Sequence, residues 1–438
     1  MKNWKWIQAL ALSLMVVMVV TACGNNAGGS NEKETNKESA VKITLLNSKG
    51  EIQTQLEDAA KAFKEDYPNI TLEIIPVPGG QSPFEKASAL YASGNPATIT
   101  MLDTGDVEKF KDRVLDLSGE KWMADAVERS TALTTFDDKN YAFPLAIEGY
   151  GFIYNKAVVD QAVGGSFDPA TINTTSSLED LFQKIEASGK APLIISPMDW
   201  SLGAHYLPLA YAGQSADTAV VAKFVDDLKA GTVDLTSNAV FNGLMDTFDV
   251  MAQYNIDKAS PLAGTYERGP EVLGKGEVGI WFQGNWAWPQ ISSFDTASGQ
   301  YGFLPIPVSN NPDDFGNTQI SSAVSKRLVL DKEKNTAEQQ AAAKTFLEWM
   351  VYSEKGQDFL VNKANIIPAF KNITLEAQDP LAKSISEYIA KGKTEDSMST
   401  LPADHWAKVG ASMQKYLAGA GDRATLTKEI QEYWKSVK

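Results

Sequence analysis

The stretch GIWFQGNWAWPQI, residues 279–291, packs large aromatic rings closely along the chain. Its rings belong to Trp281, Phe282, Trp286 and Trp288. The stretch begins as a strand, with Ile280 and Phe282 on one face and Trp281 on the other. A break at Gly284 then places Trp286 at a turn where a helix can begin. Indole rings at such a turn are costly to leave in water. We expect most of them to enter a core and one or two to face a ligand.

The size and charge of the chain exclude some classes of partner. Its 438 residues are 43% hydrophobic, which is enough for two lobes, each with its own core. The formal net charge is -15. A field of this sign repels phosphate, so we expect no nucleic-acid binding and no broad basic face for anionic lipid. The acidity suits a protein that is dissolved outside the cytoplasm.

The N-terminus has the pattern of a secretion signal. Basic residues precede an apolar run at 7–20 that is short for a membrane span, and small residues then lead to Cys23. This resembles the lipobox of bacterial lipoproteins, which implies cleavage before Cys23 and lipid on its thiol. An ordinary signal with an incidental Cys is the alternative. We therefore predict a signal peptide at 1–22 and a lipidated Cys with a disordered linker at 23–40, since 24–40 holds no large apolar residue.

The first folded part of the chain alternates strands with helices. The pattern predicts strands at 41–46, 70–75 and 98–102 and helices at 51–67 and 84–93. This alternation favours an α/β fold with a mostly parallel sheet. Ligands bind such sheets beyond the carboxyl ends of the strands, which singles out the loops at 47–49 and 103–106. Asp and Asn also favour turns and caps, so capping and ligand contact both remain open for Asp106.

The rest of the chain also contains both predicted helices and predicted strands. The pattern predicts helices at 178–188, 201–212, 216–230, 239–254, 338–352, 406–417 and 426–437, with strands at 193–196 and 301–307. Ser177 and Asp180 resemble the cap pair of the first of these helices. An extended segment at 144–147 is interrupted at Glu148 and Gly149, which suits a crossing between two lobes. Glu148 would then lie in a cleft, although a surface position is the alternative.

Several blocks of the sequence together carry a family resemblance. They are the strand and helix around 47–67, PLAIEG at 144–149, FIYNK at 152–156, KGE at 275–277, GNWAW at 284–288, LP at 304–305 and the tail at 401–406. In this order they resemble the family 1 extracellular solute-binding proteins of carbohydrate ABC importers, of the maltose-binding type. The resemblance runs from about residue 41 to the C-terminus.

The resemblance implies a two-lobed α/β fold, type II-like, in which each lobe is a mostly parallel sheet flanked by helices and a hinge joins the lobes. Lobe I would comprise 41–146 with 321–378, and lobe II 149–318 with 380–438. Stacking on sugar is implied for Trp286, Trp406 and Trp200, and hydroxyl contacts for Glu148, Asp106, Asp103, Asn47 and Ser48. Trp281 and Trp288 are further candidates. Ser48 replaces an acidic residue of the maltose type, which leaves the identity of the sugar open.

Enzymatic readings find little support in the sequence. The two His residues show no metal-ligand spacing, there is no GxSxG elbow or P-loop, and the single Cys is assigned to the lipid. Among 55 acidic residues, a glycosidase-like carboxylate pair has little specificity. We expect no enzyme, metal or cofactor. The expected protein is a monomer that binds an oligosaccharide and partners the membrane permease of an importer. A secreted glycoside-active enzyme and a binder of a non-sugar solute are the alternatives.

Overall fold

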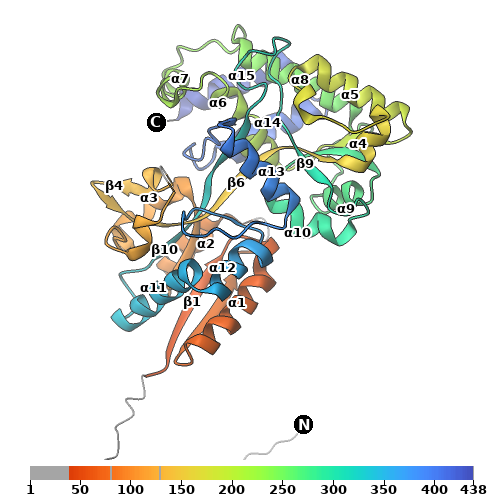
Figure 1. Ribbon diagram of the computed structural model, residues 1–438. Coiled ribbons are helices and arrows are strands. Elements are labelled where there is room, and N and C mark those ends of the chain that lie inside the picture. The colour runs from red at the N-terminus through yellow and green to blue at the C-terminus, as the bar shows by residue number, and fades with distance from the viewer. Residues whose placement is uncertain (1–38, 79–80, 128–129, 438) are drawn as a thin grey trace, which may run out of the picture. The chain divides into compact units, whose positions relative to one another are not determined.

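The computed structural model describes residues 39–78, 81–127 and 130–437 (Figure 1). The predicted signal peptide, Cys23 and nearly all of the predicted linker lie outside these residues. Within them, no helix combines the length and the hydropathy needed to cross a membrane.

Ten strands of the described chain form one mixed sheet, in the order β2-β1-β3-β10-β6-β8-β7, with β9, β11 and β12 paired beside it. They are β1 (Val41–Asn47), β2 (Ile70–Pro76), β3 (Ile99–Asp103), β6 (Phe143–Asn155), β7 (Ala191–Ile194), β8 (Val278–Gly284), β9 (Tyr301–Leu304), β10 (Ile320–Leu330), β11 (Ile367–Pro368) and β12 (Thr394–Glu395). A separate hairpin joins β4 (Thr135–Phe136) to β5 (Lys139–Asn140).

The long strands β6 and β10 make the observed sheet less parallel than expected. β1 is parallel to β2 and β3, and β7 is parallel to β8, as the alternation predicted. However, β10 is antiparallel to both β3 and β6, and β6 is antiparallel to β8. The expectation of separate, mostly parallel sheets is thus corrected to one mixed sheet. The expected break at Glu148 and Gly149 is also wrong, because β6 runs through both residues and pairs there with β10.

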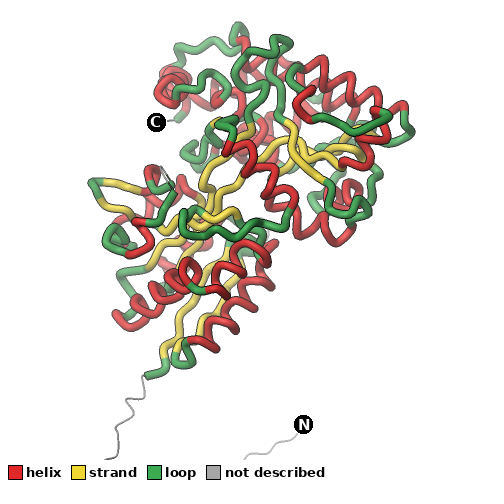
Figure 2. Tube along the Cα trace, viewed as in Figure 1, coloured by secondary structure: helices red, strands yellow, loops and turns green. Residues whose placement is uncertain are grey.

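Helices flank this sheet (Figure 2). They are α1 (Gln53–Asp66), α2 (Pro83–Ala92), α3 (Val107–Phe110), α4 (Lys156–Val163), α5 (Thr175–Ala187), α6 (Leu209–Ala212), α7 (Thr218–Ala230), α8 (Ala239–Tyr254), α9 (Arg268–Gly274), α10 (Trp288–Ile291), α11 (Ala337–Tyr352), α12 (Glu354–Asp358), α13 (Pro380–Ala390), α14 (His405–Leu417) and α15 (Arg423–Ser436). The helix predicted at 201–212 is instead a π-helical turn, Ser201–Tyr206, followed by α6.

Successive residues of a strand pack into hydrophobic cores on opposite faces of the sheet. In β1, Leu45 joins a core with residues of α1 and α11, whereas Leu46 joins one with residues of α2. In β8, Ile280 and Phe282 enter one core and Trp281 another, as the alternation predicted. Helices therefore cover both faces, which is the architecture of layered α/β proteins.

The strand β9 and the cap of α5 differ from expectation. β9 ends at Leu304 rather than 307, since prolines follow it. The cap of α5 lies one turn earlier than predicted: Thr174 accepts from the Ser177 amide, and the Ser177 side chain completes a reciprocal box. Asp180 is exposed and takes no part in this cap.

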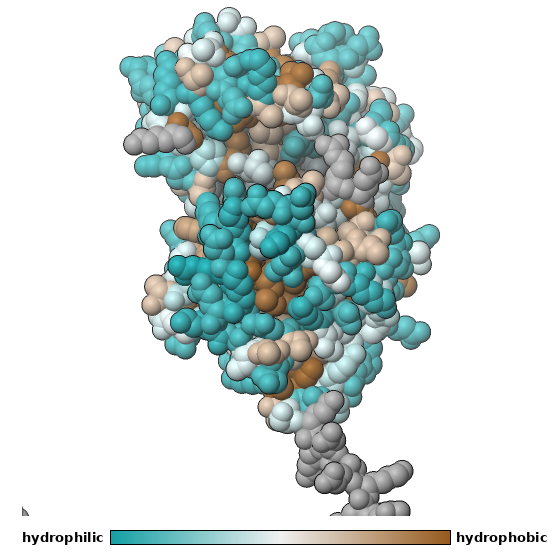
Figure 3. Space-filling model, turned by 90° about the vertical axis from the view of Figure 1, so that its left-hand side faces the viewer, coloured by the Kyte–Doolittle hydropathy of each residue, from teal (hydrophilic) through white to brown (hydrophobic). Residues whose placement is uncertain are grey.

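The surface is mainly polar. The face drawn in Figure 3 is mostly hydrophilic, with hydrophobic residues in separate small patches. Large exposed hydrophobic residues in the described chain are spread along the sequence, from Tyr67 to Ile389. Scattered residues of this kind are ordinary for a folded protein and do not mark an interface.

Candidate functional site

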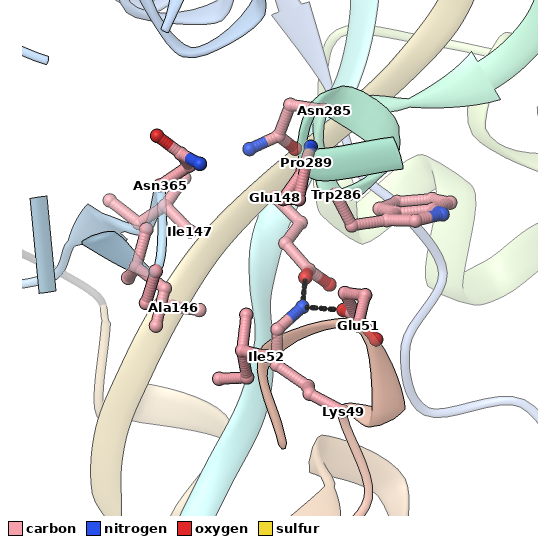
Figure 4. Close-up of a pocket in the computed structure, with 12 residues that line it drawn as sticks. Lys49, Glu51, Ile52, Ala146, Ile147, Glu148, Asn285, Trp286, Pro289 and Asn365 are labelled. Carbon is pink, nitrogen blue, oxygen red and sulfur yellow. Dashed lines mark hydrogen bonds and ion pairs between the residues drawn. The ribbon is translucent and has the colours of Figure 1, made fainter. Parts of the chain in front are cut away.

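A pocket forms beyond the ends of β1 and β8, beside the interior of β6 (Figure 4). Its polar and aromatic lining is Lys49, Glu51, Glu148, Asn285, Trp286 and Asn365. The residues come from segments that are distant in sequence, as expected at the strand ends of an α/β sheet. Within the described residues, no cluster of His, Cys, Asp and Glu has the grouping of a metal site.

The floor of the pocket is a buried ion network. Figure 4 shows the Lys49 ammonium between the carboxylates of Glu148 and Glu51. Lys49 donates to Glu148 Oε1, and its Nζ lies 2.6 Å from Glu51 Oε1. The Ser325 hydroxyl donates to the other oxygen of Glu148. The side chains of Lys49 and Glu148 are only 5% and 9% exposed, so each charge depends on the other.

The network determines the ionisation of its members. Burial alone would raise the pKa of the Glu148 carboxyl, but Lys49, Lys326 and the hydrogen bonds hold it below its usual range. Burial alone would lower the pKa of Lys49, but Glu148 and Glu51 raise it. Both groups therefore remain charged near neutral pH.

A second charged pair lies on the adjoining strands. Lys326 of β10 stands opposite Asp103 of β3 and donates to its carboxylate. Asp103 is half exposed, at 49%, and is free to accept more hydrogen bonds. Asp106 instead pairs with Lys109 at 2.7 Å. Although Asp106 precedes α3, its side chain makes no cap hydrogen bond, so the capping alternative is not realised.

The position of Trp286 depends on Gly284. A Cβ on Gly284 would lie 2.0 Å from Cζ3 of Trp286, so the indole packs directly over the glycine. Asn285 holds the turn to the neighbouring strand, because its Oδ1 accepts from the Gly149 amide at 2.9 Å. Trp286 is half-buried, which leaves part of its ring available beside the ion network.

Further aromatic rings surround Trp286. Its ring centroid is 5.0 Å from that of His205 and 6.3 Å from that of Tyr150. The ring of Trp200 lies 5.5 Å from His205 and 5.6 Å from Tyr266. We call Tyr150, Trp200, His205, Tyr266 and Trp286 the aromatic wall. Flat rings beside acidic and amide groups suit a ligand with apolar CH faces and a rim of hydroxyls.

The predicted loop residues Asn47 and Ser48 behave differently from each other. The Asn47 side chain is buried and is engaged locally, accepting from the Lys49 amide at 2.8 Å and donating to Gln53 at 2.9 Å. Among the described residues, the buried Ser48 hydroxyl has no hydrogen-bond partner. Ser48 is therefore the better candidate for a ligand contact.

The predicted tryptophans fall into two groups. Trp281 is 0% exposed and donates to Ser196 Oγ at 2.9 Å, so the expectation that it contacts a ligand is corrected. Trp288 packs against Tyr301 in the same core and is also left out of the candidate site. Trp281 follows the strand alternation into the core, and the half-buried Trp288 begins α10. Trp200 and Trp406 are half-buried, and Trp200 belongs to the aromatic wall.

Sequence reasoning missed Lys326, His205 and Tyr150 as members of the site. It singled out the loop at 47–49 but gave Lys49 no role of its own. Lys49 and Glu148 are 99 positions apart, and their pairing depends on a sheet that no local pattern specifies. His205 lies five positions after Trp200, and only a π-helical turn brings their rings together. A search for aromatic residues after a predicted strand could have found His205, whose ring partners Trp200 and Trp286 were already candidates.

Comparisons with known proteins show which family and which structures the chain is similar to. Residues 58–385 match the model of the bacterial extracellular solute-binding protein family. An uncharacterized ABC transporter extracellular-binding protein of Pyrococcus horikoshii is 22% identical, over 89% of this chain and 86% of that protein. The solute-binding protein RafE in complex with raffinose has a TM-score of 0.75 and 18% identity, covering 90% of this chain and 99% of that one. A chitin oligosaccharide binding protein has a TM-score of 0.74 and 20% identity, covering 90% and 98%.

Proposed function

The chain belongs to the bacterial extracellular solute-binding protein family, and on this premise we propose that it is the lipid-anchored component of an ABC importer that captures a neutral oligosaccharide and delivers it to the permease. The family consists of binding proteins rather than enzymes, so the glycoside-active alternative is set aside. The similar structures include proteins whose bound or named ligands are sugars, which makes a carbohydrate the first choice here.

The half-buried indole of Trp286 beside the buried ion network is the observation that carries this proposal. A pyranose presents an apolar face that stacks on such a ring and hydroxyls that reach carboxylates. Asp103 and the unpartnered Ser48 hydroxyl supply further polar contacts. The charges of Glu148 and Lys49 already neutralise each other, so the main role of this ion pair is to keep the pocket rigid.

The charges around the pocket favour a neutral sugar over an anionic one. The ammonium groups of Lys49 and Lys326 are each matched by a carboxylate, and Glu51 adds another. No positive charge is left over in this group to balance a phosphate or a uronic acid. A phosphorylated solute is therefore disfavoured.

We propose that the sugar is bound between lobe I, residues 41–146 with 321–378, and lobe II, residues 149–318 with 380–438. The pocket draws its lining from both segments: Lys49 from the first, and Asn285 and Trp286 from the second. A ligand that contacts both lobes only when they are closed shifts the population toward the closed form. The importer would recognise the closed form. We propose that the binding protein is a monomer and that lipid on Cys23 holds it at the outer face of the membrane.

A thermal-shift screen tests the proposal. The probes are raffinose, chitotriose, xylotriose and maltotriose, with a glycerol phosphate and a short peptide as non-sugar probes. At least one neutral sugar is expected to raise the Tm, because it binds the folded state alone. Trp286→Ala is expected to weaken binding of that sugar about 5- to 150-fold, as the loss of a stacking ring costs about 1–3 kcal/mol.

Trp288→Ala is the matched control. It also removes an indole from the GNWAW block, but one that packs against Tyr301 in a core. It should lower the Tm without sugar and leave the affinity of the folded protein unchanged. Equal affinity of the Trp286→Ala variant and the wild type would contradict the proposed site. A response to the phosphate or peptide alone would contradict the sugar.

A further inference from the structure

We propose that His205 is a specificity-determining residue that hydrogen-bonds a hydroxyl of the oligosaccharide through its imidazole. The inference rests on the proposed function and extends it to a residue that no sequence pattern singled out. The sugar hydroxyls would then be recognised by a residue of the aromatic wall as well as by the carboxylates near the pocket.

The ring of His205 is held in a defined orientation. It contacts Tyr150 at 4.8 Å, Trp286 at 5.0 Å and Trp200 at 5.5 Å between ring centroids. Within the part of the chain that the structure describes, no hydrogen bond reaches either of its ring nitrogens. The residue as a whole is half-buried, and its ring packs beside the stacking ring of Trp286.

His405 shows what a structural histidine looks like in the same protein. It is 1% exposed, and its Nε2 lies 3.2 Å from the hydroxyl of Tyr211. Polar groups that are packed away from a ligand usually find such partners. The buried Nδ1 of His405 has no partner among the described residues, so the two histidines differ mainly in burial. His205 is the half-buried one, and it lies among three aromatic rings with both ring nitrogens unpartnered in the described chain, which suits contact with a ligand.

The backbone around His205 is also unusual. Residues Ser201–Tyr206 form a π-helical turn, and such turns often occur at functional sites because the extra residue re-aims a side chain. The turn is packed tightly against α14. A Cβ on Gly203 would lie 2.2 Å from the Trp406 carbonyl oxygen, and one on Gly410 would lie 2.4 Å from that of Asp199. This close packing holds His205 in place.

The charges near His205 allow it to act as a neutral group. Burial lowers its pKa to about 4, against the opposing attraction of Glu148 and Asp103 and with a contribution from Lys326. At pH 7 the imidazole is therefore neutral, so one nitrogen donates and the other accepts. A hydroxyl can take either role, so this ring suits a sugar with a free hydroxyl next to the face that stacks on Trp286.

Histidine NMR provides a direct test, since the chain has only two His residues. The ring C–H signals of both are followed while raffinose, chitotriose, xylotriose and maltotriose are added at pH 7. The sugar that raises the Tm should shift the His205 signals and leave those of His405 unmoved. His405 is an internal control because it is buried against Tyr211.

Two variants complete the test. His205→Phe keeps a ring but loses both nitrogens, and it should weaken binding of that sugar about tenfold, the usual scale for one hydrogen bond. His205→Gln keeps a donor and an acceptor and should recover part of the loss. The Tm without sugar should change little in either variant. If a sugar binds while the His205 signals stay fixed and His205→Phe keeps full affinity, this inference is overturned and the proposed function stands. If none of the four sugars binds, the proposed function fails, and this inference fails with it.

Discussion

Glu148 illustrates how one side chain gains its role from partners far along the chain. The sequence placed it in a cleft, and the structure places it in the lining of the pocket. It also contacts Lys49 and Ser325, which are distant in sequence. Removing one partner of such a buried pair leaves the other charge without compensation. This uncompensated charge accounts for most of the stability that is lost.

Glu148→Leu is therefore expected to lower the free energy of unfolding by about 3–5 kcal/mol, because Lys49 loses its main counter-charge. Urea unfolding at pH 7 measures this change. The double variant Lys49→Met with Glu148→Leu should lose less than the sum of the single variants. Additive losses would contradict the coupling seen in the network.

The same residue predicts a pH dependence. The pKa of Glu148 is lowered in the folded state, from an ordinary value of 4.5. Its contribution to stability is thus fully present above about pH 4.5 and is lost as the pH falls through the folded pKa. The stability difference between wild type and Glu148→Leu should shrink below about pH 4.5 in unfolding curves. A constant difference down to pH 3 would contradict this.

At the scale of elements, the sequence predicted which segments are helical more accurately than it predicted where each helix begins and ends. The apolar faces of α5 and α8 follow the helical period, so their existence was predicted. The start of α5 was misplaced because Ser177 lies inside the box, as the partner of Thr174 rather than as the cap itself. Strand ends and helix caps depend on single hydrogen bonds, which a periodic pattern does not resolve.

Thr174→Ala tests the observed cap. It removes the side chain that accepts from the Ser177 amide, and it should cost about 1 kcal/mol of stability. Asp180→Ala is the control, because this exposed residue makes no cap hydrogen bond. Its effect should stay within about 0.5 kcal/mol. Urea unfolding of both variants compares them, and an equal loss in the two would contradict the assigned cap.

At the scale of the whole molecule, the described chain is joined by the shared strands β6 and β10. β10 pairs with β3 at one end and with β12 near the other, and β6 passes from β10 to β8 and β9. The proposed lobes are thus linked by continuous strands. Bending of these strands would let a ligand bring the two proposed lobes together.

The proposed membrane anchor gives a prediction at this scale. Cys23→Ser removes the thiol that would carry the lipid, so the protein should move from the membrane fraction to the medium when expressed in a bacterium that processes lipoproteins. Asn26→Ser, in the same predicted linker, is the control and should stay with the membrane. Fractionation and incorporation of labelled palmitate measure both. Retention of the Cys23→Ser variant at the membrane would contradict the anchor.

The sequence by itself determined the family resemblance, the α/β class and most helices, because periodic burial and turn residues are local properties. It also indicated Trp286, since Gly284 and Asn285 mark the turn in which the indole lies. The tertiary structure alone decided that β6 and β10 make one mixed sheet, that Trp281 packs inward, that Lys49 pairs with Glu148, and that His205 packs beside Trp286. These features depend on contacts between residues that are distant along the chain. Their energies depend on burial and on paired charges, which exist only once the chain has folded.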